Sequence, residues 1–103
     1  MKFPIPFLAL AALAQADTQV IWESCKGDRT ISQSGAGVCT NVAGRPTSGL
    51  CKIIIPRHGA DRCEFYTASC GQPGGKTYHC SAATSPCDTR SWEPITVYRC
   101  GPN

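Results

Sequence analysis

The 103-residue chain lacks closely spaced cysteine pairs, acceptor sites for N-linked glycans and long hydrophobic runs. It has no Cys-x-x-Cys, and its nearest cysteines are separated by six residues. Zinc sites and thioredoxin-like redox sites use closer pairs, so we expect no metal, redox centre or other cofactor. No apolar run approaches the ~20 residues of a membrane-spanning helix, and we therefore expect no membrane span.

Two sequence patterns of enzymes are also missing. Residues 70–80, CGQPGGKTYHC, contain Gly-Lys-Thr, which is how the nucleotide-binding loop pattern ends. However, Cys70 stands where that pattern requires glycine. The next residues, 76–79, favour a strand, whereas a phosphate loop leads into a helix. There is no Gly-x-Ser-x-Gly elbow and no carboxylate pair at a recognisable spacing. We therefore interpret residues 70–80 as the tip of a β-hairpin.

The first sixteen residues have the form of a secretory signal. Lys2 supplies the positive start, residues 3–13 are apolar, and Ala14-Gln15-Ala16 has the small-x-small form of a cleavage site. We expect residues 1–16 to be a signal peptide and residues 17–103 to be one secreted, extracellular domain. Without Lys2, nine Lys and Arg face seven Asp and Glu, a charge of about +2. That charge is too weak to indicate a nucleic-acid or membrane partner by itself.

Cysteine is the most informative residue type that is present. An even number in a short exported chain predicts a disulfide framework, because a chain of this size has only a marginal core. The spacing leaves the pairing of the eight cysteines open. They are Cys25, Cys39, Cys51, Cys63, Cys70, Cys80, Cys87 and Cys100.

The remaining pattern predicts a small, disulfide-rich, mainly β domain. We expect an antiparallel sheet of about four to five short strands, at residues 19–22, 51–55, 64–67, 76–79 and 95–98, where β-branched and aromatic residues gather. The apolar run 51–55 suits a central strand buried on both faces. One short helix over residues 30–40, capped by Asp28, would make the fold α+β, although Gly35 and Gly37 disfavour it.

The length of the hairpin loop decides which side chains share a face. A five-residue loop, 71–75, places Thr67 opposite His79 and puts Arg62 and His79 on opposite faces. A loop one residue shorter brings these two side chains to the same face.

Residues 58–80, HGADRCEFYTASCGQPGGKTYHC, resemble a segment of the small secreted fungal ribonucleases, and residues 20–31, VIWESCKGDRTI, resemble the start of ribonuclease-like fungal effectors. The resemblance implies that Arg62 would stabilise charge on a phosphorane and that His79 would protonate the leaving group. Lys52, Arg57 and His58 would then line a phosphate path. Residues 50–57, where that family has a catalytic glutamate, contain no carboxylate.

In overall format the chain resembles the small secreted cysteine-rich effectors of fungi. This resemblance implies a binding protein that acts extracellularly or on a host target, without catalysis, and whose partner is a host or extracellular protein or surface. Its recognition loops would be 44–49, 57–61, 71–75 and 82–90, because loops on a rigid scaffold commonly bind partners. The alternative is a small secreted ribonuclease, or an inactive relative that binds RNA.

Overall fold

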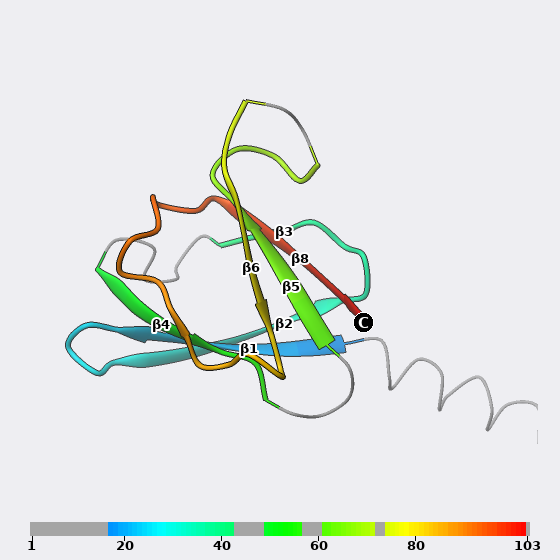
Figure 1. The fold of residues 1–103 in the computed structure, drawn as a ribbon. Coiled ribbons are helices and arrows are strands. Elements are labelled where there is room, and N and C mark those ends of the chain that lie inside the picture. The colour runs from blue at the N-terminus through cyan, green and yellow to red at the C-terminus, as the bar shows by residue number, and fades with distance from the viewer. Residues whose placement is uncertain (1–16, 43–48, 57–60, 72–73, 103) are drawn as a thin grey trace, which may run out of the picture.

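Two antiparallel sheets form the domain in a computed structural model that describes residues 17–42, 49–56, 61–71 and 74–102. The first sheet has the strand order β2-β1-β4-β7 and the second has the order β3-β8-β5-β6. In Figure 1 the first sheet runs across the view and the second crosses it obliquely. The strands are β1 (Asp17–Ser24), β2 (Arg29–Gly35), β3 (Thr40–Asn41), β4 (Leu50–Ile54), β5 (Asp61–Tyr66), β6 (Thr77–Ser81), β7 (Cys87–Asp88) and β8 (Val97–Pro102).

The predicted small, disulfide-rich, mainly β fold is confirmed, and all five predicted strands have a counterpart. The single sheet of four to five strands is wrong, because the described residues form two four-stranded sheets, which also include β2, β3 and β7. The helix over residues 30–40 is wrong, since most of this segment lies in β2, which pairs with β1 from Asp17↔Gly35 to Glu23↔Arg29. The described residues contain no helix, and so none that could cross a membrane. The predicted signal peptide, residues 1–16, lies outside the described residues.

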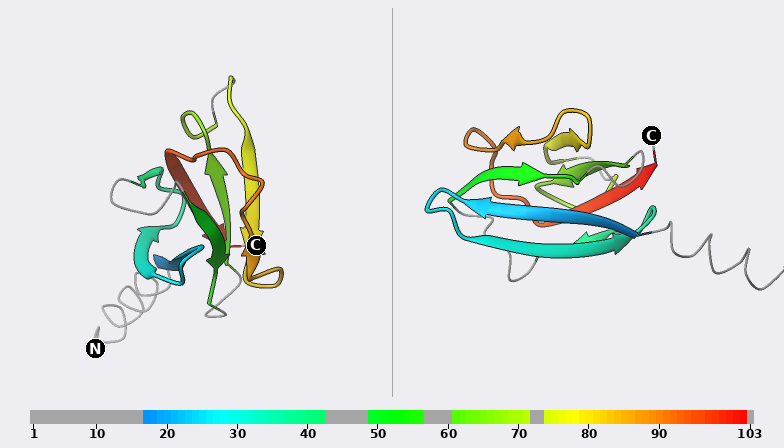
Figure 2. Two further views of the ribbon diagram at one scale, coloured as in Figure 1. Left: turned by 90° about the vertical axis from the view of Figure 1, so that its left-hand side faces the viewer. Right: turned by 90° about the horizontal axis from the view of Figure 1, so that it is seen from below.

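β4 is an inner strand, as predicted, because it lies between β1 and β7. Its burial on both faces is wrong: Ile53 is fully buried, whereas Lys52 is exposed and Ile54 is only partly covered. The strand therefore has one face toward the core and one toward solvent, as is common in antiparallel sheets. Figure 2 shows β4 running beside the β1–β2 hairpin.

The core lies between the sheets and is built around aromatic rings. Trp22 of β1 packs in T-shaped geometry against Phe65 and Tyr98 of the second sheet, with ring centroids 5.6 and 5.3 Å from theirs. All three side chains are fully buried. The Trp22 Nε1–H donates to Ser32 Oγ over 2.9 Å, and that oxygen is 2.7 Å from the Tyr98 hydroxyl. A buried polar contact therefore joins β1, β2 and β8 inside the core.

Four disulfides connect the strands, and all eight cysteines are paired. This confirms the predicted framework and indicates an extracellular or secreted protein. One bridge links the two sheets, because it joins β6 to β7. The pairs are Cys25–Cys51, Cys39–Cys70, Cys63–Cys100 and Cys80–Cys87.

Candidate functional site

The register of β5 and β6 decides the relation between Arg62 and His79. Glu64 lies opposite His79 and Arg62 lies opposite Ser81, so all four side chains share the outer face of the second sheet. Neither predicted loop length is correct, because the ladder continues only to Thr67, whose N–H donates to the Lys76 carbonyl. The described residues beyond this pair, 68–71 and 74–75, lie outside the ladder.

The residues beyond Thr67 are constrained by a disulfide and by glycine. Cys70 is bonded to Cys39, which lies just before β3, so this end of the hairpin is tied to a segment outside it. Gly71 and Gly74 adopt φ values of 71° and 100°, which an ordinary strand residue rarely adopts. The two predicted residues therefore share one face, as the shorter loop required, but through a different register.

A charged cluster occupies this outer face, and Glu64 is its centre. One oxygen of Glu64 lies 3.4 Å from His79 Nε2, and the other lies 3.3 Å from an Arg99 guanidinium nitrogen. The Tyr66 hydroxyl donates a short hydrogen bond to the same carboxylate. The Arg99 guanidinium also donates to the Tyr66 hydroxyl over 3.1 Å and lies over the Tyr66 ring. Three neighbouring strands thus supply one connected set of polar groups.

The environment keeps Glu64 ionised. The hydrogen bond from Tyr66 lowers the pKa of Glu64 below its usual 4.5, with help from Arg99 and His79, against an opposing effect of burial. Burial and the nearby Glu64 raise the pKa of Tyr66, so its hydroxyl stays protonated and donates. The cluster at neutral pH is therefore a carboxylate surrounded by donors.

Arg62 stands at the edge of this cluster between two hollows of about 370 and 310 Å³. The first is lined by His79 and Ser81, and the second by Glu64 and Arg99. Arg62 is exposed, and its guanidinium makes no ion pair with any residue that the structure describes. It is therefore available to an anionic ligand.

The structure describes only one of the three residues predicted to line a phosphate path, Lys52. Lys52 points away from Arg62, because it lies on the outer face of the first sheet and contacts Glu23. Arg57 and His58 lie outside the described residues, as do most of loops 44–49 and 57–61 and residues 72–73 of loop 71–75. The structure thus brings Arg62 and His79 together and separates Lys52 from them.

Sequence reasoning missed Glu64, Tyr66 and Arg99. The alternation of side chains along a strand places Glu64 and Tyr66 on the same face as Arg62, so these two were accessible from the sequence. Arg99 comes from β8, which pairs with β5 across 35 residues of sequence at Glu64↔Arg99. No local pattern identifies that partner.

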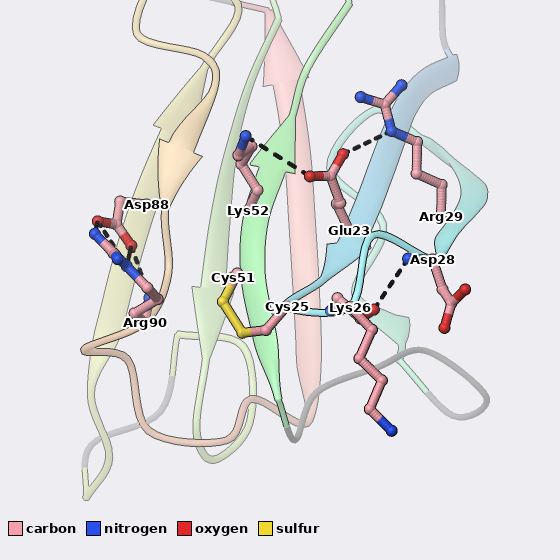
Figure 3. A network of polar contacts seen from close by, with 10 residues as sticks. Glu23, Cys25, Lys26, Asp28, Arg29, Cys51, Lys52, Asp88 and Arg90 are labelled. Atoms are coloured by element: carbon pink, nitrogen blue, oxygen red, sulfur yellow. Dashed lines mark hydrogen bonds and ion pairs between the residues drawn. A yellow bond between two sulfur atoms is a disulfide. The ribbon is translucent and has the colours of Figure 1, made fainter.

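A second polar network lies on the opposite side of the domain (Figure 3). Glu23 accepts from Arg29 over 2.7 Å and lies 3.6 Å from the Lys52 ammonium. Asp88 is held by Arg90 at 2.6 Å, and this contact lowers the pKa of Asp88 to about 2. All of these groups except Arg29 border a hollow of about 570 Å³. Nothing in this network combines a histidine with a carboxylate, so it has less catalytic potential than the Glu64 cluster.

No protein family, curated protein or solved structure matches this chain. Among the described residues, no group of three or more His, Cys, Asp and Glu is placed to hold a metal ion. The roles of Arg62 and His79 therefore remain predictions that stand on the geometry of the cluster.

Proposed function

We propose that the protein is a secreted, effector-like binding protein that acts outside the producing cell. It engages an acidic surface of a host or extracellular protein through the outer face of the second sheet. The observation that carries this proposal is that Arg62, which makes no ion pair with any described residue, lies on the same face as Arg99 and His79, around the carboxylate of Glu64. The cluster carries more positive than negative groups and is built on paired strands, so it is already ordered before binding.

The geometry favours binding over catalysis for two reasons. Tyr66, Arg99 and His79 already contact the oxygens of Glu64. The lowered pKa also makes this carboxylate a weaker base than a catalytic group that works near neutral pH. The hollows beside Arg62 are open to solvent, so they exclude little water from a reacting group.

Binding to an immobilised oligo-glutamate peptide, measured by surface plasmon resonance at 50 and 150 mM salt, tests this proposal. We expect Arg62→Ala to weaken binding by up to about fivefold, because it removes the available guanidinium and one exposed ionic contact is worth at most about 1 kcal/mol. The matched control is Lys26→Ala, which removes an exposed cation at the turn after β1. Equal losses for both variants would mean that overall charge, and not this face, attracts the peptide.

The second candidate is a small ribonuclease, or a relative that binds RNA without cutting it. The shared face of Arg62, Glu64 and His79 favours it. In such a site Glu64 would accept the proton of the ribose 2′-hydroxyl while that oxygen bonds to phosphorus. His79 would protonate the departing 5′-oxygen, and Arg62 would stabilise the charge on the phosphorane.

A cleavage assay on single-stranded RNA across pH 5–8 distinguishes an active ribonuclease from a relative that binds RNA without cutting it. The enzyme requires that Arg62→Ala and His79→Ala each abolish cleavage by the purified protein. If the wild type does not cut RNA at any of these pH values, the catalytic version is wrong. Binding of intact RNA that weakens with salt and with Arg62→Ala would then support the non-catalytic version.

A further inference from the structure

The outer face of the first sheet carries a row of apolar side chains that crosses three strands. The register places Ile21 opposite both Ile31 and Ile54. Ile31 is 55% exposed, and the other two side chains are partly covered. Extending the register of β4 and β7 by one residue places the exposed Pro86 beside Ile54. An apolar row therefore lies open on a sheet whose other face packs against the core.

A charged row runs beside the apolar row. Arg29 lies opposite Glu23, Glu23 opposite Lys52, and Lys52 opposite Asp88, so the signs alternate across all four strands. Figure 3 shows these side chains on one side of the sheet, in the same order. The order plus, minus, plus, minus becomes its complement when it is reversed.

We propose that this face binds a second copy of the same chain, so that the protein forms a two-fold symmetric dimer through its first sheets. A two-fold axis parallel to β1 and β4, midway between them, reverses the strand order in the partner. Ile21 of one copy then faces Ile54 of the other, and Ile31 faces Pro86. The same rotation brings Glu23 over the second copy's Lys52. The face is thus complementary to itself in both rows, as a two-fold interface requires.

The central charged pair contributes most of this complementarity. Lys52 Nζ lies 3.6 Å from Glu23, which is longer than a hydrogen bond, so its protons can donate to the facing carboxylate. Lys52 is 47% exposed and can reach across an interface. The outer contact, Arg29 with Asp88, adds less because Asp88 already accepts from Arg90. The hollow of about 570 Å³ beside this row has room for side chains of the second copy.

The isoleucines supply attraction, and the charges supply orientation. Burial of apolar area stabilises association, whereas exposed ion pairs contribute little and mainly fix the register of the two copies. The patch is small, so we expect a weak dimer that forms reversibly with concentration. The outer faces of the second sheets remain open on opposite sides of this dimer.

Sedimentation velocity on the secreted, disulfide-bonded protein tests the apolar row. The protein is measured from 1 µM to 1 mM, about the range of the dissociation constants of weak complexes. We expect the weight-average mass to rise toward twice the monomer mass. Ile31→Asp should weaken association at least tenfold. The matched control is Val38→Asp, because Val38 is 53% exposed but lies outside this sheet. A wild type that stays monomeric throughout, or equal losses in both variants, would overturn the proposal.

A charge exchange tests the orientation. Lys52→Glu places like charges face to face across the two-fold axis and should weaken association about tenfold. The double variant Glu23→Lys with Lys52→Glu makes the row plus, plus, minus, minus, which is again self-complementary, so association should largely return. If the single variant associates as the wild type does, or the double variant stays as weak as the single one, this arrangement of the dimer is wrong.

Discussion

Replacement of Ser32 by alanine tests the polar contact inside the core. Ser32 is 7% exposed, and its hydroxyl contacts the fully buried Trp22 and Tyr98. An indole N–H can only donate, so without this oxygen it stays buried and unpaired. Each buried group left without a partner costs about 1–3 kcal/mol. The tyrosine hydroxyl can turn and therefore loses less than the indole. We expect Ser32→Ala to lower the free energy of unfolding by about 2–4 kcal/mol in total.

The loss is measured by urea denaturation at pH 7 with the disulfides intact, followed by tryptophan fluorescence. In a domain of this size each kcal/mol lowers the melting temperature by roughly 4–8 °C, so in thermal unfolding the variant should melt roughly 8–32 °C below the wild type. The neighbouring Ser34 is an internal control. It is 6% exposed on the same face of β2, and its Oγ has no hydrogen-bond partner among the described residues.

Ser34→Ala should be neutral or slightly stabilising, because it removes a buried hydroxyl that makes no bond. The comparison separates the hydrogen bonds from the effect of removing an oxygen atom from this strand. If Ser32→Ala stays within about 0.5 kcal/mol of the wild type, the range of an ordinary surface substitution, the contact does not stabilise the fold. An equal loss in both variants would refute the reasoning as well.

Three further predictions follow from the charges and the disulfides. Glu64 has a lowered folded pKa, so its contribution is present above the unfolded value of about 4.5 and is lost as the pH falls through the folded value. The stability difference between wild type and Glu64→Gln in urea should therefore be largest at pH 7 and vanish at low pH. NMR titration should give Asp88 a pKa of about 2, which returns toward 3.8 in Arg90→Gln. Serine substitution of Cys80 and Cys87, which are seven residues apart, should cost about 2.4 kcal/mol in chemical denaturation, against about 3.5–3.8 for a bridge that closes 26 to 37 residues.

The strands that could be predicted from the sequence are those with local apolar character. β1 and β4 contain the β-branched residues that favour strands, and both predictions are confirmed. β2 was missed because its sequence, RTISQSG, is mostly polar. Its strand form depends on pairing with β1 and on the contact of Ser32 with Trp22 and Tyr98. Such partners are distant in the sequence, so local propensity does not identify them.

The candidate site divides in the same way. Arg62 and His79 were identified by a resemblance within one continuous segment, and strand alternation would have added Glu64. Their placement on one face depends on the register of β5 and β6, which pairs Glu64 with His79. The count of cysteines predicts that bridges exist, but their pairing depends on the folded positions of the strands. The local sequence therefore identifies individual residues of the site, whereas their arrangement depends on strand pairing and disulfides between distant segments.

The two outer faces of the domain differ in a way that connects both proposals. The second sheet presents an available cation, Arg62, on an open and strongly hydrated surface, where a single ionic contact is worth at most about 1 kcal/mol. One such face binds an acidic partner weakly. The first sheet presents complementary rows instead, and pairing through it turns two second-sheet faces outward. The two faces point in opposite directions, so a rigid dimer presents only one of them to any single surface and gains no avidity there, because avidity requires simultaneous engagement. The dimer can instead bridge two separate acidic partners. Lys52→Glu should therefore leave binding to an oligo-glutamate surface unchanged, whether dense or sparse, and should reduce the clustering of oligo-glutamate-coated beads that the wild type bridges.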